Sequence, residues 1–103
     1  MRFLMKVSIP VEAGNKAAKK GSLGKTITSI LAEQKPEAAY FLAVNGQRTG
    51  LIFLDMQDVS QIPSLAEPWF LSFNASVEIS PVMTPDDLKK ATKDIEKAVK
   101  KYG

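Results

Sequence analysis

Apolar and polar residues alternate along the beginning of the chain. A period of two residues is typical of a strand with one buried and one exposed side. The pattern predicts a strand over residues 2–9, ended by Pro10. Its two sides carry Phe3, Met5, Val7 and Ile9 on one, and Leu4, Lys6 and Ser8 on the other.

The next segment changes to a helical pattern. A short polar turn is expected from Asn15 to Gly21, after which Ser22 is a suitable N-cap residue. Apolar residues then recur at helical spacing until Pro36, which stops the helix. The residues on this stripe are Leu23, Ile27, Ile30 and Leu31.

Two β-rich runs follow, at residues 38–44 and 49–56. They are joined by Asn45-Gly46, a pair that favours the tight turn of a β-hairpin. A two- or four-residue loop keeps Tyr40, Leu42, Leu51 and Phe53 on one face of the sheet, whereas an odd loop or a bulge would change the set.

A second helix is predicted after Asp58, where Asp-x-x-Gln forms a capping-box pattern with Gln61. Pro63 and Pro68 are expected to distort or divide this helix. Its end carries the aromatic run EPWFLSF, in which Trp69 and Phe73 share one side and Phe70 points elsewhere. Core packing combined with a subunit interface is the first interpretation of these aromatic residues, and a ligand-facing Trp69 is the alternative.

Alternation returns over residues 74–80 and predicts a last strand. Thr84-Pro85-Asp86-Asp87 then combines an N-cap, a proline at the first helical position and acidic residues in the first turn. One helix is expected to run from there to the end of the chain. Its apolar stripe consists of Leu88, Ala91, Ile95, Ala98, Val99 and Tyr102.

The order strand, helix, strand, strand, helix, strand predicts an α+β, ferredoxin-like domain over residues 1–103, with a four-stranded antiparallel sheet and an additional C-terminal helix. Helices cover one face of such a sheet. The other face is too apolar to be left in water. It would carry Leu4, Lys6, Tyr40, Leu42, Leu51 and Phe53.

Composition narrows the chemistry, because the chain contains neither cysteine nor histidine. Disulfides, thiolate nucleophiles, imidazole bases and the usual zinc and haem ligands are therefore excluded. No metal and no cofactor is expected. The net charge of +3 resides largely in C-terminal lysines, which is too weak and local for a nucleic-acid interface. No apolar run is long enough for a membrane span, and the N-terminus is interpreted as a strand of a cytoplasmic protein.

The sharpest candidates for a site lie on the uncovered face. In the ferredoxin-like order the first strand lies between the third and the last, so Lys6, Asp55 and Glu78 would project from neighbouring strands. Tyr40 shares the face one strand further away. A lysine near carboxylates and a phenol can support acid–base chemistry or hold an anion. A structural ion pair that fixes register is the more common arrangement and is favoured here.

The element order, the two apolar sheet faces and the run AEPWFLSFNASVEISPVMTPDDL resemble the dimeric α/β-barrel superfamily, and within it a family of small bacterial proteins of unassigned function. EQKPEAAYF and the ending AVKKYG extend the resemblance over nearly the whole chain. The resemblance implies a homodimer in which two sheets pack face to face. The superfamily includes isomerases, cofactor-independent monooxygenases and haem-binding enzymes, so it assigns no reaction.

Two hypotheses about function remain. The first is a homodimeric protein that binds a small molecule, including a cofactor-independent isomerase or monooxygenase, with Lys6, Tyr40, Asp55 and Glu78 lining the site and Trp69 at its edge. The second is a non-catalytic dimeric protein-interaction module in which the same residues lock the dimer. A partly polar cavity would favour the first hypothesis, and complete salt-bridging would favour the second.

Overall fold

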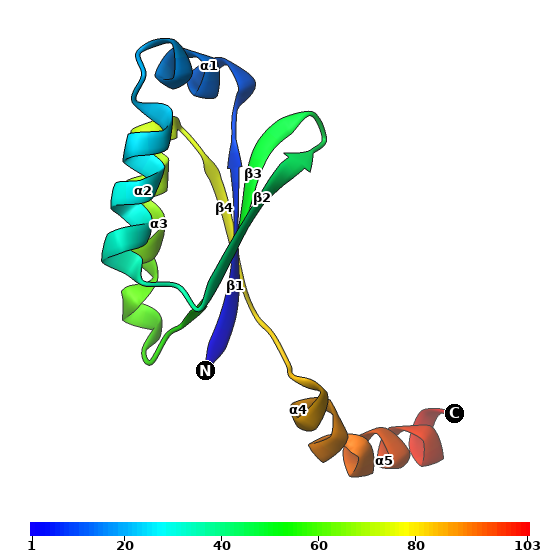
Figure 1. Cartoon of the computed structure of the whole chain (residues 1–103). Coiled ribbons are helices and arrows are strands. Elements are labelled where there is room, and N and C mark those ends of the chain that lie inside the picture. Colours follow the sequence, from blue (N-terminus) through cyan, green and yellow to red (C-terminus); the bar gives the residue numbers. More distant parts are fainter.

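A four-stranded antiparallel sheet forms the centre of the structure, a computed structural model that describes all 103 residues (Figure 1). The strand order is β2-β3-β1-β4, which is the ferredoxin-like arrangement predicted from the sequence. The first strand therefore lies between the third and the last, as expected. The strands are β1 (Arg2–Ile9), β2 (Ala38–Val44), β3 (Gln47–Asp55) and β4 (Ser76–Pro81).

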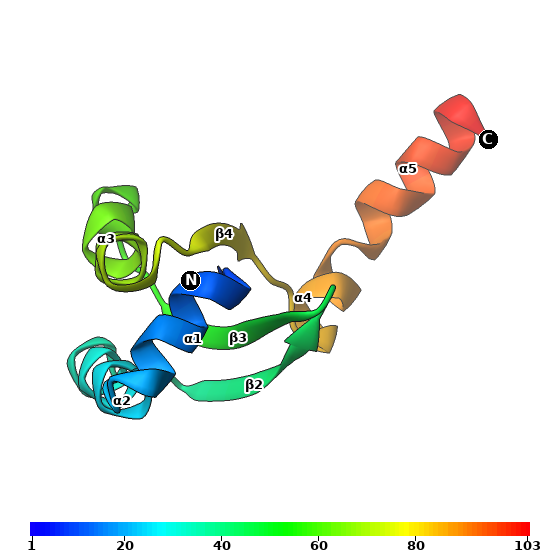
Figure 2. The same ribbon diagram turned by 90° about the horizontal axis from the view of Figure 1, so that it is seen from above.

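Two helices lie side by side on one face of the sheet (Figure 2). They are α2 (Leu23–Gln34) and α3 (Ile62–Phe73), the latter preceded by the short 3₁₀ helix η1 (Val59–Gln61). The expected capping box at the start of η1 is confirmed, because Asp58 accepts a hydrogen bond from the backbone N–H of Ser60 and the Gln61 side chain accepts one from Asp58. Pro63 lies in the first turn of α3, and Pro68 lies inside the helix without dividing it.

The core fills the space between this helical layer and the sheet. Trp69, Met5 and Ile52 are completely inaccessible to solvent. The alternation predicted for the first and last strands is confirmed. In β1, Met5, Val7 and Ile9 are buried between less buried neighbours, and in β4 the half-buried Val77 and Ile79 alternate with exposed residues. The core cluster consists of Met5, Val7, Ile9, Ile30, Ile52, Leu54, Met56, Trp69, Phe73 and Ala75.

A third helix, α1 (Val11–Lys19), closes one end of the molecule between β1 and α2 (Figure 1). The prediction of a polar turn from Asn15 to Gly21 was wrong for most of this segment. The helix begins directly after Pro10, and only Lys20 and Gly21 form the turn, with Gly21 at φ +74°. Gly14 and the half-buried Ala17 give α1 a packing face that is too small to appear as an apolar stripe in the sequence.

The β2–β3 hairpin has the expected two-residue turn. Asn45 and Gly46 have φ values of +52° and +74°, and Val44 is paired with Gln47 across the turn. Positive φ at both central residues is the signature of a type I′ turn, for which Asn-Gly is favoured. The predicted assignment of residues to the two sheet faces is therefore confirmed.

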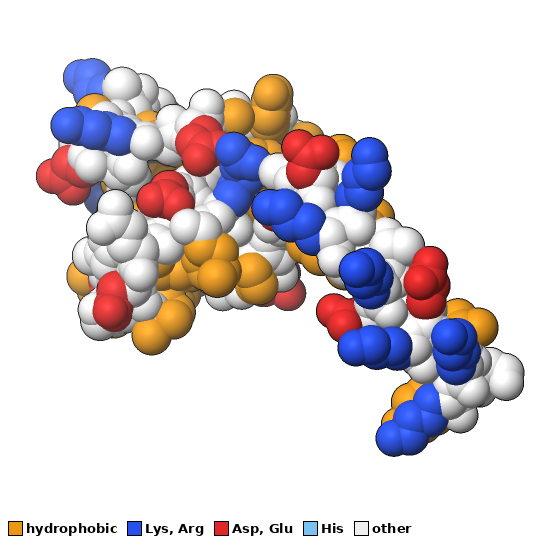
Figure 3. All heavy atoms as spheres, turned by 90° about the horizontal axis from the view of Figure 1, so that it is seen from below, with side chains coloured by type: hydrophobic (Ala, Val, Ile, Leu, Met, Phe, Trp, Pro, Cys, Tyr) orange, Lys and Arg blue, Asp and Glu red, His pale blue; other side chains and the backbone are white.

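The C-terminal segment differs from its prediction. The N-cap of Thr84 is confirmed, but the helix divides at Ala91 into α4 (Pro85–Lys90) and α5 (Thr92–Tyr102). We call α4 and α5 together the arm. No residue of the arm is buried, and it projects from the body with its lysines along it (Figure 3). The radius of gyration of 17.2 Å, against about 13 Å for a compact chain of this length, reflects this projection.

Candidate functional site on the open face of the sheet

The open face is the face of the sheet that α2 and α3 do not cover. One row of cross-strand partners runs over it through all four strands. Tyr40 pairs with Leu51, Leu51 pairs with Lys6, and Lys6 pairs with Glu78. Three of the predicted site residues, Lys6, Tyr40 and Glu78, thus lie in one line, with a leucine separating the phenol from the amine.

Lys6 and Glu78 form an ion pair in this row, with 3.8 Å between Nζ and Oε2. The lysine side chain retains 34% of its exposure and the glutamate 75%, so water screens the pair on its glutamate side. An exposed pair of this length contributes little to folding. The strength of the interaction between Lys6 and Glu78 therefore depends on whether another molecule covers the row and excludes water.

The rest of the open face is mainly apolar. Phe53 and Leu4 pair beside the central row, and the rings of Tyr40 and Phe53 meet edge to face with their centroids 6.5 Å apart. Tyr40 is 63% exposed and Leu42 45% exposed, so these side chains leave a large apolar area in water. Exposed apolar surface of this kind is typical of an interaction surface.

Asp55 lies on the open face but not beside Lys6. It is paired with Arg2 at the end of β3, two rows away from the lysine, and its carboxylate binds the N-terminal amine of Met1 at 2.7 Å. Within one chain, therefore, Asp55 forms an ion pair at the end of the sheet and does not form a cluster with Lys6 and Glu78.

Trp69 does not lie at the edge of the open face. It is fully buried on the opposite side of the sheet, and its indole Nε1 donates to Oε1 of Gln34 at 3.4 Å. Trp69 and Phe73 point into the core with ring centroids 6.2 Å apart, while Phe70 is partly exposed, so the predicted division of the aromatic residues is confirmed. The alternative of a ligand-facing Trp69 is wrong for the single chain.

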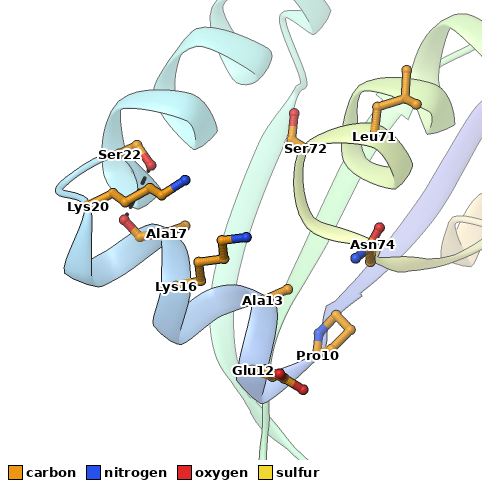
Figure 4. Close-up of a pocket in the computed structure, with 10 residues that line it drawn as sticks. All are labelled: Pro10, Glu12, Ala13, Lys16, Ala17, Lys20, Ser22, Leu71, Ser72 and Asn74. Atoms are coloured by element: carbon orange, nitrogen blue, oxygen red, sulfur yellow. Dashed lines mark hydrogen bonds between the residues drawn. The ribbon is translucent and has the colours of Figure 1, made fainter.

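The three main hollows in the surface all lie around α1. The α1–α3 hollow, of about 530 Å³, lies between α1 and the end of α3 (Figure 4). Lys16 and Lys20 extend into it from α1, and Ser72 and Asn74 face them from the other side. Its lysines are exposed, and the hollow is wide and mostly polar.

A second hollow, of about 590 Å³, lies where the tip of the β2–β3 hairpin meets α1 and α2. We call it the hairpin hollow. Arg48 lies in its wall and was not among the site residues predicted from the sequence. The alternation of β3 could have predicted this position. Arg48 shares its face of the strand with Gly50, Ile52 and Leu54, and that face is turned towards the helices.

Two carboxylates have a lowered pKa, and both belong to capping boxes at helix N-termini, outside the candidate site. Hydrogen bonds from the side chain and backbone of Ser60 hold the pKa of Asp58 below its ordinary value. The backbone and side chain of Thr84 do the same to the pKa of Asp87. No three acidic side chains gather into a group suited to a metal ion. Neither observation adds a reactive group to the open face.

Comparisons with known proteins leave the family open. No protein family matches the chain, and no curated protein has a significantly similar sequence. Among solved structures, a formyltetrahydrofolate deformylase from Pseudomonas putida KT2440 is similar over 80% of this chain, with 14% identity and a TM-score of 0.49. The match spans only 29% of that enzyme's chain. None of the helices combines the length and apolar character needed to cross a membrane.

Proposed function

We propose that the protein is a homodimer of the dimeric α/β-barrel kind that binds a small molecule between two open faces. The observation that carries this proposal is the central row of the open face. A charged pair, Lys6 and Glu78, lies there among apolar side chains that have no cover within the chain. Covering the face with a second copy would remove the apolar area from water and enclose the pair.

Enclosure would change the chemistry of the row. A lysine and a glutamate 3.8 Å apart are screened in water, but their interaction strengthens as the local dielectric constant falls. The Tyr40 hydroxyl, carried by the same row, would supply a hydrogen-bond donor. These groups suit a small polar ligand, and proton transfer between Lys6, Tyr40 and such a ligand is the form that catalysis would take.

A second candidate function is a non-catalytic dimeric interaction module. The pairing of charges favours it, since Lys6 contacts Glu78 and Asp55 contacts the N-terminal amine. In this case the ion pair fixes the register of two sheets, and the arm presents its apolar stripe to another protein. The two functions differ in what the loss of Lys6 would do.

The first experiment is native mass spectrometry of the purified chain, with Leu51→Asp as the test variant and Leu71→Asp as its control. Leu51 lies in the central row, whereas Leu71 is 80% exposed on α3, away from the open face. We expect a dimer for the wild type and for Leu71→Asp, and a monomer for Leu51→Asp. A monomeric wild type would refute the proposal.

Lys6→Ala separates the two functions. A dimer that has lost a co-purifying small molecule supports the binding protein. Dissociation into monomers supports the interaction module, because the ion pair would then hold the subunits together.

A further inference from the structure

The hairpin hollow combines apolar walls with one positioned cation. Two of its large apolar residues remain substantially exposed: Val11 at 47% and Phe41 at 50%. Its volume of about 590 Å³ lies within the range of about 300–1,000 Å³ that small-molecule pockets occupy. The apolar and polar residues of the lining come from β1, α1, α2 and the hairpin, so one chain makes the whole hollow.

Arg48 supplies the cation, and its position is fixed by α1. Its Nη1 and Nη2 atoms donate to Oδ1 of Asn15 at 3.2 and 3.1 Å. The guanidinium lies against Gly14, where an added Cβ would stand 2.5 Å from Nη1. The absence of a side chain at Gly14 therefore permits the close approach, and the Asn15 amide orients the group.

The charge of Arg48 has no acidic partner. The chain contains three ion pairs, made by the N-terminal amine, Arg2 and Lys6, and no carboxylate lies within 4 Å of Arg48. Lys16 and Lys19 line a neighbouring hollow that shares Val11 and Asn15 with this one. Glu12 is the only acidic residue of that lining, so basic residues outnumber acidic ones around α1. Asn15 satisfies only part of the donor capacity of the guanidinium.

We propose that the hairpin hollow binds a small organic carboxylate with an apolar body. The carboxylate would take the free donors of Arg48, because a planar guanidinium matches two carboxylate oxygens. The body would cover Ile27 and Phe41, which are part of the apolar lining. The site lies within one chain and does not depend on the proposed dimer.

Octanoate is the probe for this site, titrated into ¹⁵N-labelled full-length protein and followed by backbone amide shifts. We expect saturable shifts at Asn15, Ile27 and Phe41. Acetate tests the apolar body and 1-octanol tests the charge, and each is expected to bind at least about tenfold more weakly than octanoate.

The variants isolate the guanidinium. Arg48→Gln is expected to lose about tenfold to a hundredfold in octanoate affinity, as for a lost charge-assisted hydrogen bond. Arg2→Gln removes the same charge from the end of the sheet and is expected to bind like the wild type. Gly14→Ala keeps Arg48 but displaces its guanidinium, so it should also weaken binding. This second variant tests the proposal even if Arg48→Gln does not fold.

Three results would overturn the proposal: no octanoate binding by the wild type, wild-type affinity in Arg48→Gln, or shifts confined to open-face residues such as Leu4 and Phe53. Repeating the titration with Leu51→Asp distinguishes this site from the proposed interface site. The hairpin hollow should bind octanoate in that variant whether or not the wild type is a dimer.

Discussion

The side chain of Gln34 connects the two helices of the buried layer through Trp69. Its Oε1 accepts from the indole Nε1 at 3.4 Å, and its Nε2 donates to the backbone carbonyl of Leu65 at 2.8 Å. One glutamine at the end of α2 thus satisfies a buried donor and an acceptor on α3. The only tryptophan of the chain is fixed as a core residue by this arrangement.

Replacing this glutamine should destabilise the fold. Gln34→Leu leaves the indole N–H without a partner and removes the second hydrogen bond to the Leu65 carbonyl, which we expect to cost about 1–3 kcal/mol in the free energy of unfolding. Glu33→Leu makes a similar change at the neighbouring exposed position and should stay within about 0.5 kcal/mol of the wild type. Urea unfolding followed by Trp69 fluorescence measures both. Equal midpoints for the two variants would show that the Gln34 bonds add nothing.

Two glycines should respond to alanine with opposite signs. Gly46 has φ +74° in the hairpin turn, so Gly46→Ala is strained and should cost about 1–2 kcal/mol. Gly24 lies in α2 and a Cβ there meets no atom within 4 Å, so Gly24→Ala should stabilise by up to about 1 kcal/mol. Thermal unfolding compares the variants. Stabilisation by Gly46→Ala would contradict the turn geometry.

Stability should fall in acid through the Asp58 cap. Because hydrogen bonds from Ser60 lower the pKa of Asp58 in the folded chain, its contribution is fully present above the unfolded pKa of about 3.9. It is lost as the pH falls through the lower folded value. Asp58→Asn should therefore show a smaller decrease in the urea midpoint than the wild type as the pH falls from about 5 into the acid range. Parallel curves for the two proteins would contradict this assignment.

Removal of the arm should leave the body folded. No residue of α4 or α5 is buried, so a chain ending at Met83 loses no part of the core. We expect its free energy of unfolding, measured by Trp69 fluorescence, to change by less than about 1 kcal/mol. A body that no longer unfolds cooperatively would mean that the arm packs against it in solution. Small-angle scattering of the intact chain checks the projection independently.

Local signals in the sequence were sufficient for much of the fold. The Asn45-Gly46 turn and the caps at Asp58 and Thr84 depend on backbone conformation and on hydrogen bonds within a few residues, so the sequence displays them directly. The same holds for the two sheet faces. Once a two-residue turn sets the register, the period of the strand decides that Lys6 and Tyr40 share one face.

Features that depend on distant neighbours were missed or misplaced. Helix α1 contains Gly14 and Asn15, which are poor helix formers, but there Gly14 admits the Arg48 guanidinium and Asn15 binds it. Pro68 is tolerated inside α3, where the carbonyl that it leaves unbonded belongs to the exposed Ser64 and can be hydrated. Nothing local marks the break at Ala91.

The sequence by itself determined the order of the four strands and of the two helices that cover the sheet, the hairpin turn, the caps at Asp58 and Thr84 and the composition of each sheet face, because these follow from short-range periodicity and backbone preference. Only the tertiary structure decided that Trp69 belongs to the core and not to the open face, and that Asp55 lies two rows from Lys6. It also decided that Arg48 meets α1 across 33 residues of sequence. Contacts between remote segments depend on how the layers stack, and no local pattern encodes that arrangement.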